Sequence, residues 1–105
     1  MIMQEMDLSD AHQRMLLDIA RACIRQALCG AADQMVPASS DAVLNMPAGC
    51  FVSLHDHASH RLRGCVGRLD ARTPLIRCIY EMSSGVLGDP RFRNNPVTLQ
   101  ELSRL

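Results

Sequence analysis

The sequence predicts a single α+β domain, and three patterns along its 105 residues indicate this class. A stripe of apolar residues at helical spacing covers about residues 10–28, two extended segments lie at about 50–55 and 61–69, and a second helical pattern covers about 74–85. The extended segments are close enough along the chain to form an antiparallel hairpin, with one helix before it and one after it. A chain of this length is long enough for one domain and too short for two, so we expect residues 1–105 to form a single unit.

The two helices are indicated by apolar residues that recur every three or four positions and therefore share one face. In the first helix these are Leu16, Ile19, Ala20, Cys23, Ile24, Ala27 and Leu28. Ser9 or Asp10 is suited to cap its start, and Gly30 is a natural stop. In the second helix, Thr73 is the predicted cap and Pro74 the predicted first helical residue. Its apolar face is formed by Leu75, Ile79, Met82 and Val86.

Two other segments carry local signals. Residues 31–49, which contain Pro37, Ser39, Ser40, Asn45, Pro47 and Gly49, are expected to connect the first helix to the hairpin, and nineteen residues are long for such a connection. Thr98 and Glu101 have the spacing of a capping box, which predicts a last helical turn from that point.

The charges are balanced overall but unevenly placed. Residues 1–60 hold three Arg against seven acids, whereas residues 61–93 hold seven Arg against three acids. All eleven basic residues are Arg, which excludes Schiff-base catalysis and a P-loop lysine. The basic segment is either a solvated face or an anion-facing patch around residues 61–77. The scarcity of aromatic residues argues against nucleic acid as its partner.

The five cysteines, at positions 23, 29, 50, 65 and 78, form no CxxC pair. Acidic residues interrupt the first ten positions, so the sequence shows no secretory signal. No apolar run approaches the roughly 20 residues of a membrane span. We therefore expect free thiols in a reducing cytoplasm, and no membrane partner.

The segment that carries the most chemistry is the hexapeptide Leu62-Arg63-Gly64-Cys65-Val66-Gly67, within the second extended segment. Strict alternation along a strand assigns its first, third and fifth residues to the core face and leaves Cys65 on the other face beside Arg63. A neighbouring guanidinium favours the thiolate, which is the nucleophilic form of cysteine. The hypothesis that follows makes Cys65 a nucleophile and Arg63 its electrostatic partner.

The glycines of the hexapeptide leave an alternative open. A bulge at Gly64 would reverse the alternation and bury Cys65 as an inert core residue. Glycine within a strand also marks places where another backbone or a ligand comes close. Gly64 and Gly67 are therefore candidate ligand-binding positions, together with Leu62 and Val66.

His55, His57 and His60 lie within six residues at the predicted hairpin loop. An H-x-H pair on a strand can hold a metal ion, but no fourth ligand has the spacing of a structural zinc site, so we predict no metal site and no cofactor. Solvated loop histidines are one interpretation. A base that serves Cys65 across the hairpin is the other.

The run Asp89-Pro90-Arg91-Phe92 follows the second helix. It is either only a rigid turn or a polar site beside the strand, because short loops bring helix ends back to the sheet. In the second case Asp89 and Arg91 are candidate ligand-binding residues.

These motifs together resemble the AMMECR domain family. They are Phe51-Val52-Ser53-Leu54, the complete hexapeptide at 62–67, Pro74-Leu75, the run at 89–92 and Val97-Thr98-Leu99-Gln100-Glu101-Leu102. The opening helix, with Leu16-Leu17-Asp18-Ile19-Ala20-Arg21, is also similar to the family's first helix. The resemblance covers nearly the whole chain and implies an α+β fold with the hexapeptide on or beside a strand.

The family domain is usually nearly twice this length, so the chain looks like its N-terminal half, incomplete at the C-terminus. Further strands and a helical part would then be absent, which predicts an uncovered sheet edge. In a fragment of a longer protein the missing strands would cover that edge, whereas in a complete product the edge predicts a homodimer or another partner. Relatives are associated with a Memo-like protein and a radical SAM protein in the AmmeMemoRadiSam system. The resemblance thus implies a modification or maturation pathway with those two partners.

Two functions from different classes remain open, so the sequence does not decide whether the chain is an enzyme. In the first, Cys65 is a nucleophile or covalent carrier acting on a small anionic ligand, with backbone N–H groups around the glycines as oxyanion donors. In the second, the chain is a non-catalytic adaptor that docks a partner protein through its Arg-rich face.

Overall fold

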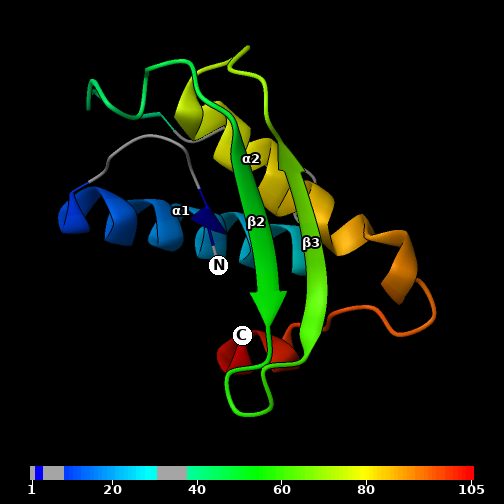
Figure 1. Ribbon diagram of the computed structural model, residues 1–105. Helices are drawn as coiled ribbons and strands as arrows, with labels where there is room; N and C mark the ends of the chain where they lie inside the picture. Colours follow the sequence, from blue (N-terminus) through cyan, green and yellow to red (C-terminus); the bar gives the residue numbers. More distant parts are fainter. Residues whose placement is uncertain (1, 4–8, 31–37) are drawn as a thin grey trace.

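The computed structural model describes residues 2–3, 9–30 and 38–105, and it confirms the α+β class (Figure 1). Two helices and a small antiparallel sheet form the body, and three short 3₁₀ turns follow the second helix. The elements, in order, are β1 (Ile2–Met3), α1 (Asp10–Leu28), β2 (Cys50–His55), β3 (Leu62–Arg68), α2 (Leu75–Gly85), η1 (Val86–Gly88), η2 (Pro90–Phe92) and η3 (Gln100–Arg104). The first part of the predicted connection, residues 31–37, lies outside the described residues.

Both helices begin within a residue of the predicted positions, but only one predicted cap is confirmed. Ser9 caps α1, because its Oγ accepts the backbone N–H of His12 at 3.1 Å. The predicted cap Thr73 is wrong: Pro74 occupies the cap position of α2, and the buried Thr73 hydroxyl has no hydrogen-bond partner in the described part of the chain. Pro74 instead forms an isolated bridge with Pro47, so a tertiary contact sets the start of this helix.

The sheet has the order β1-β2-β3, and all its pairings are antiparallel. The hairpin of β2 and β3 was predicted, whereas the two-residue strand β1 was not. β1 pairs Ile2 with Val52 and Met3 with Phe51, so it partly covers an edge of β2 that the sequence predicted to be open. A strand of two residues has too short a pattern to be recognised in sequence.

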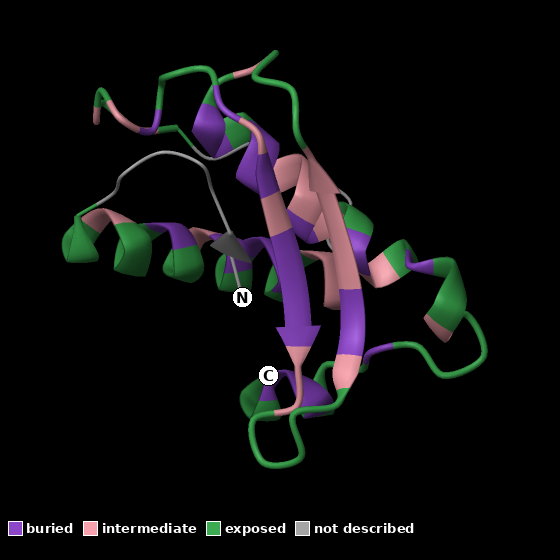
Figure 2. Cartoon of the chain, viewed as in Figure 1, coloured by how far each residue is buried: buried purple, intermediate pink, exposed green. Residues whose placement is uncertain are grey.

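The core lies between the helices and one face of the sheet (Figure 2). Val52 and Leu54 point into it from β2 and are at most 2% exposed, and their spacing of two residues places them on one face of the strand. The predicted faces of both helices are buried there too, with Leu16 and Ile24 from α1 and Ile79 from α2 all nearly inaccessible. The apolar periodicity therefore gave the correct inner face of both helices.

The turns after α2 return the chain to the far end of the hairpin. Residue Val86 of η1 is buried against the sheet, and η3 closes the domain beside α1. The capping box at η3 is confirmed: the Glu101 amide donates to Thr98 Oγ1 at 3.2 Å, and the Thr98 amide donates to Glu101 Oε1 at 3.4 Å. Within the described residues no helix is long and apolar enough to cross a membrane.

Candidate functional site

The hexapeptide begins with a break in the strand register. Leu54 pairs with Gly64, but the next residue, His55, pairs with Leu62, so Arg63 is an extra residue on β3. A bulge of this kind breaks alternation locally. The sequence considered a bulge at Gly64; it lies one residue earlier, and beyond it Cys65 pairs regularly with Ser53 and is half-buried.

The bulge overturns the predicted placement of Arg63 on an open face beside Cys65. Arg63 is 5% exposed, and its Nε and Nη2 donate to the two carboxylate oxygens of Glu101 at 2.5 and 3.2 Å. Nη2 also donates to the Asn95 carbonyl at 2.8 Å, and the guanidinium lies 5.4 Å from the centre of the Phe92 ring. No hydrogen bond or ion pair joins Arg63 to Cys65 in the described part of the chain.

Glu101 and Arg63 hold each other in their charged forms. The hydrogen bond from Arg63 lowers the pKa of the Glu101 carboxyl, and burial opposes this only in part. The same bond raises the pKa of the Arg63 guanidinium. A planar guanidinium that meets both oxygens of a carboxylate fixes two elements firmly, so this pair locks β3 to η3.

The glycines of the hexapeptide are explained by close packing. A Cβ at Gly64 would lie 2.9 Å from the backbone oxygen of Val86, so η1 presses on the strand there. A Cβ at Gly67 would overlap the ring of Phe51, which covers the opposite face of the sheet. A close approach to the backbone was predicted at both glycines and is present at both, where the approaching groups belong to the protein itself.

Cys65 lies beside the turn that follows the second helix. Its backbone N–H donates to Asp89 Oδ2 at 3.1 Å, which ties the strand to that turn. Asp89 is 8% exposed and also accepts from Arg91: the backbone amide and Nε donate to Oδ1 at 3.0 and 3.1 Å, and Nη2 donates to Oδ2 at 2.7 Å. The structure thus brings Cys65 of the hexapeptide together with Asp89 and Arg91 of the turn after the second helix.

Arg91 is the cation that acts on this position. Hydrogen bonding with Arg91 holds the pKa of the Asp89 carboxyl well below its usual range, although burial opposes the shift. The pKa of the Arg91 guanidinium is raised, first by Asp89 and to a smaller extent by the charge of Cys65 as a thiolate. Arg91, and not Arg63, is therefore the guanidinium that Asp89 holds near the Cys65 position.

The other residues of the predicted site have packing roles in the structure. Leu62 lies opposite His55 and is half-buried, whereas Val66 pairs with Val52 and packs against the core. Among the described residues, no group of three histidines, cysteines or carboxylates is arranged to hold a metal ion. His57 and His60 are exposed in the loop.

The Arg-rich face is largely neutralised by acids. Arg68 and Arg77 both bind Glu81, at 2.9 and 3.0 Å, and Arg72 pairs with Asp70. Arg63 and Arg91 are paired as described above. Of the seven arginines in residues 61–93, only two have no acidic partner in the described part of the chain, and they are Arg61 and Arg93. The Arg-rich face therefore offers a docking partner few arginines that are not already paired with an acid.

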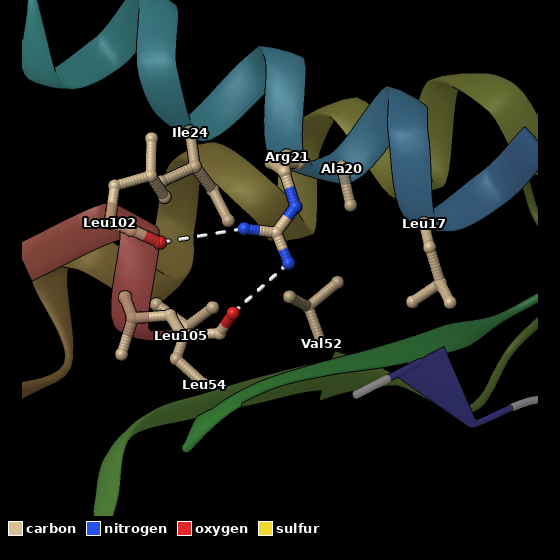
Figure 3. A pocket seen from close by; sticks show the side chains of 8 residues that line it. All are labelled: Leu17, Ala20, Arg21, Ile24, Val52, Leu54, Leu102 and Leu105. Atoms are coloured by element: carbon tan, nitrogen blue, oxygen red, sulfur yellow. Dashed lines mark hydrogen bonds between the residues drawn. The ribbon is translucent and has the colours of Figure 1, made fainter. Parts of the chain in front are cut away.

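An apolar cavity of about 110 Å³ lies on the other side of the domain, between α1, β2 and η3 (Figure 3). Arg21 spans it and donates to the carbonyl oxygens of Leu102 and Leu105, at 3.4 and 3.0 Å. The other side chains drawn in Figure 3, such as Val52 and Leu54, are apolar. The arginine anchors the last turn to α1, and none of the predicted site residues lines this cavity.

Sequence reasoning missed the partners that define the surroundings of the hexapeptide. Glu101 was recognised only as a helix cap, and Asn95 was given no role. Phe92 lies with its ring close to two guanidinium groups, those of Arg63 and Arg91. The capping box located Glu101 correctly, but nothing in its spacing relates it to a strand 38 residues earlier.

The fold and these motifs define an α+β protein of the AMMECR1 type. The AMMECR1 family model matches residues 17–105, and the chain belongs to this family. It is 39% identical over 87 residues to a protein of Methanocaldococcus jannaschii, a match that covers 82% of this chain and 41% of the relative. A protein of Methanothermobacter thermautotrophicus is 36% identical over 96 residues, which is 90% of this chain and 48% of that relative.

A solved structure supports the same assignment. The crystal structure of an uncharacterized protein from Pyrococcus horikoshii matches with a TM-score of 0.78 and 28% identity, over 90% of this chain and 47% of that one. The chain thus spans less than half the length of each of these relatives.

Proposed function

We propose that Cys65 is a reactive thiol that acts on a small anionic ligand, with Arg91 as its electrostatic partner and Asp89 as the residue that positions both. The activity belongs to a modification or maturation pathway in the cytoplasm. Membership of the AMMECR1 family supports such a pathway, together with the resemblance to proteins associated with Memo-like and radical SAM partners.

One observation carries the proposal: Asp89 binds the Cys65 backbone amide and the Arg91 guanidinium through the same carboxylate oxygen. That oxygen fixes the guanidinium close to the strand position that bears the thiol. A cation held near a half-buried cysteine favours the thiolate and thereby its nucleophilicity. Arg91 remains 58% exposed in its side chain, so it is also free to contact an anionic ligand from solvent.

In this proposal the other hexapeptide residues shape the site without chemistry of their own. Gly64 and Gly67 let η1 and the Phe51 ring approach the strand, and Arg63 locks its end to η3. Leu62 and Val66 pack beside this position, Val66 against the core. The ligand would approach the face that carries Cys65.

The test is the rate of alkylation of each cysteine by iodoacetamide, followed by peptide mass spectrometry over a range of pH. Cys29 is exposed and serves as the internal reference, whereas Cys23, Cys50 and Cys78 are buried. We expect Cys65 to react in the folded chain, and the Arg91→Gln variant to slow it severalfold below neutral pH without affecting Cys29. Arg93→Gln, which removes a nearby charge that has no acidic partner in the described residues, is the matched control.

Two results would contradict the proposal. One is a Cys65 that reacts only after unfolding. The other is an equal rate in the Arg91→Gln and Arg93→Gln variants. In cells, full function of a Cys65→Ser variant would exclude a nucleophilic role and leave the adaptor function, which an Arg61→Ala or Arg93→Ala variant would then test by loss of partner binding.

A further inference from the structure

A second polar region lies beside Arg63, between the hairpin loop and the last turn. It is a cavity of about 220 Å³, and its lining includes Arg61, Arg63 and Arg104 together with Asp56, Asn95 and Glu101. Cys65, Asp89 and Arg91 do not line it. It is therefore separate from the region of the proposed thiol chemistry.

The hydrogen bonds of Arg63 leave one of its nitrogens without a partner. Nε and Nη2 donate to Glu101 and to the Asn95 carbonyl, which accounts for three of the five N–H groups of the guanidinium. Nη1 is buried and has no hydrogen-bond partner in the described part of the chain. A charged donor that is buried and unsatisfied is costly, so such a group calls for an acceptor.

The charge of the cavity indicates the kind of acceptor. Arg63 is balanced by Glu101, and Arg104 lies 3.8 Å from Asp56. Arg61 has no acidic partner among the described residues, so the lining carries three guanidinium groups against two carboxylates. The volume corresponds to several water molecules at about 30 Å³ each, which is room for an oxyanion.

From these observations we infer that this cavity binds a small oxyanion, a phosphate or carboxylate group, through Arg61 and Arg104, with the guanidinium of Arg63 as a fixed positive charge in the lining. Guanidinium groups match both kinds of oxyanion in geometry and charge. Glu101 and Asn95 hold Arg63 in position. Arg61 and Arg104 are exposed and can close over the anion from the loop and from η3. The inference does not depend on the reactivity of Cys65.

The experiment is a titration of the full chain with inorganic phosphate and, separately, with acetate, at constant ionic strength. The readout is the NMR signals of the arginine Nε–Hε groups. We expect saturable shifts for Arg63 and Arg61 at millimolar concentrations, and the anion that saturates first identifies phosphate or carboxylate as the ligand class. The absence of saturation with both anions overturns the inference.

Substitutions separate a built site from general attraction to positive charge. Arg61→Gln and Arg104→Gln each remove one exposed guanidinium and should weaken binding about tenfold, the range of one charge-assisted hydrogen bond. Arg72→Gln removes the same charge from an exposed pair that is not part of the cavity lining, and should change the affinity less than twofold. An equal loss in all three variants overturns the inference. Arg63 is not substituted in this test, because the loss of its buried pair with Glu101 would also destabilise the fold.

Discussion

The Asp89 carboxylate accepts the backbone N–H of Cys65, with 3.1 Å between Oδ2 and the amide nitrogen. This amide of β3 thus bonds to a side chain instead of to another strand. A polar turn located 24 residues later closes the strand edge at the position of the thiol. The same carboxylate caps η2 by accepting the Arg91 amide, so one side chain sets the geometry of two segments.

The first prediction concerns this bond. In an Asp89→Ala variant the Cys65 amide loses its only side-chain acceptor among the described residues, and its hydrogen exchange should accelerate about tenfold or more, as expected for a bond to a charged group. Exchange followed by NMR measures it. The Glu101 amide, which donates a hydrogen bond to Thr98 Oγ1, should keep its exchange rate and serves as the control. Unchanged exchange at Cys65 would mean that another group protects the amide.

The second prediction concerns the buried ion pair of Arg63 and Glu101. Glu101→Gln keeps a side-chain acceptor for the Thr98 amide but removes the charge that compensates Arg63. The free energy of unfolding should fall by about 3 kcal/mol, because a buried charge then remains unpaired. Urea denaturation measures it. Asp70→Asn, in the exposed pair with Arg72, should cost less than about 1 kcal/mol. A similar small cost for Glu101→Gln would show that water reaches Arg63 freely.

The third prediction is the dependence of stability on pH. The pKa values of the Asp89 and Glu101 carboxyls are lowered in the folded chain, by Arg91 and by Arg63 respectively. At acid pH the unfolded state, whose carboxyls have pKa values near 4, therefore binds more protons than the folded state. The stabilisation is fully present above about pH 5 and is lost as the pH falls through the folded pKa values.

Urea denaturation at a series of pH values from neutral to acid measures this dependence. The Asp89→Asn and Glu101→Gln variants should each show a shallower loss of stability below about pH 5 than the unsubstituted chain. If the free energy of unfolding of both variants falls with pH as steeply as that of the unsubstituted chain, other carboxyls cause the acid sensitivity.

The fourth prediction compares three glycines. Gly64→Ala should destabilise the fold by about 1–3 kcal/mol, because its Cβ meets the Val86 backbone oxygen, which cannot rotate away. Gly67→Ala should also destabilise it, and the additional change Phe51→Ala should remove the clash.

Gly85 lies in α2 at a φ of −70° with nothing within 4 Å of an added Cβ, so Gly85→Ala should stabilise the fold by about 0.5–1 kcal/mol. Thermal unfolding measures all of these changes. Stabilisation by Gly64→Ala would be inconsistent with the close approach of η1.

The sequence by itself determined the two helices with their inner faces and the position of the hairpin. The periodic apolar residues of α1 and α2 and the capping box at Glu101 each depend on neighbours a few positions away, and such signals can be recognised from the order of residues. The family resemblance was confirmed because it used several short motifs in a fixed order.

Only the tertiary structure decided the surroundings of the hexapeptide. Alternation placed Arg63 beside Cys65, but one extra residue on β3 turned Arg63 toward Glu101, and a bulge has no reliable sequence signal. The cation near Cys65 is Arg91, from a turn that Asp89 ties to the strand. Ion pairs depend on which guanidinium and which carboxylate meet in three dimensions, and sequence spacing across 24 or 38 residues does not fix that meeting.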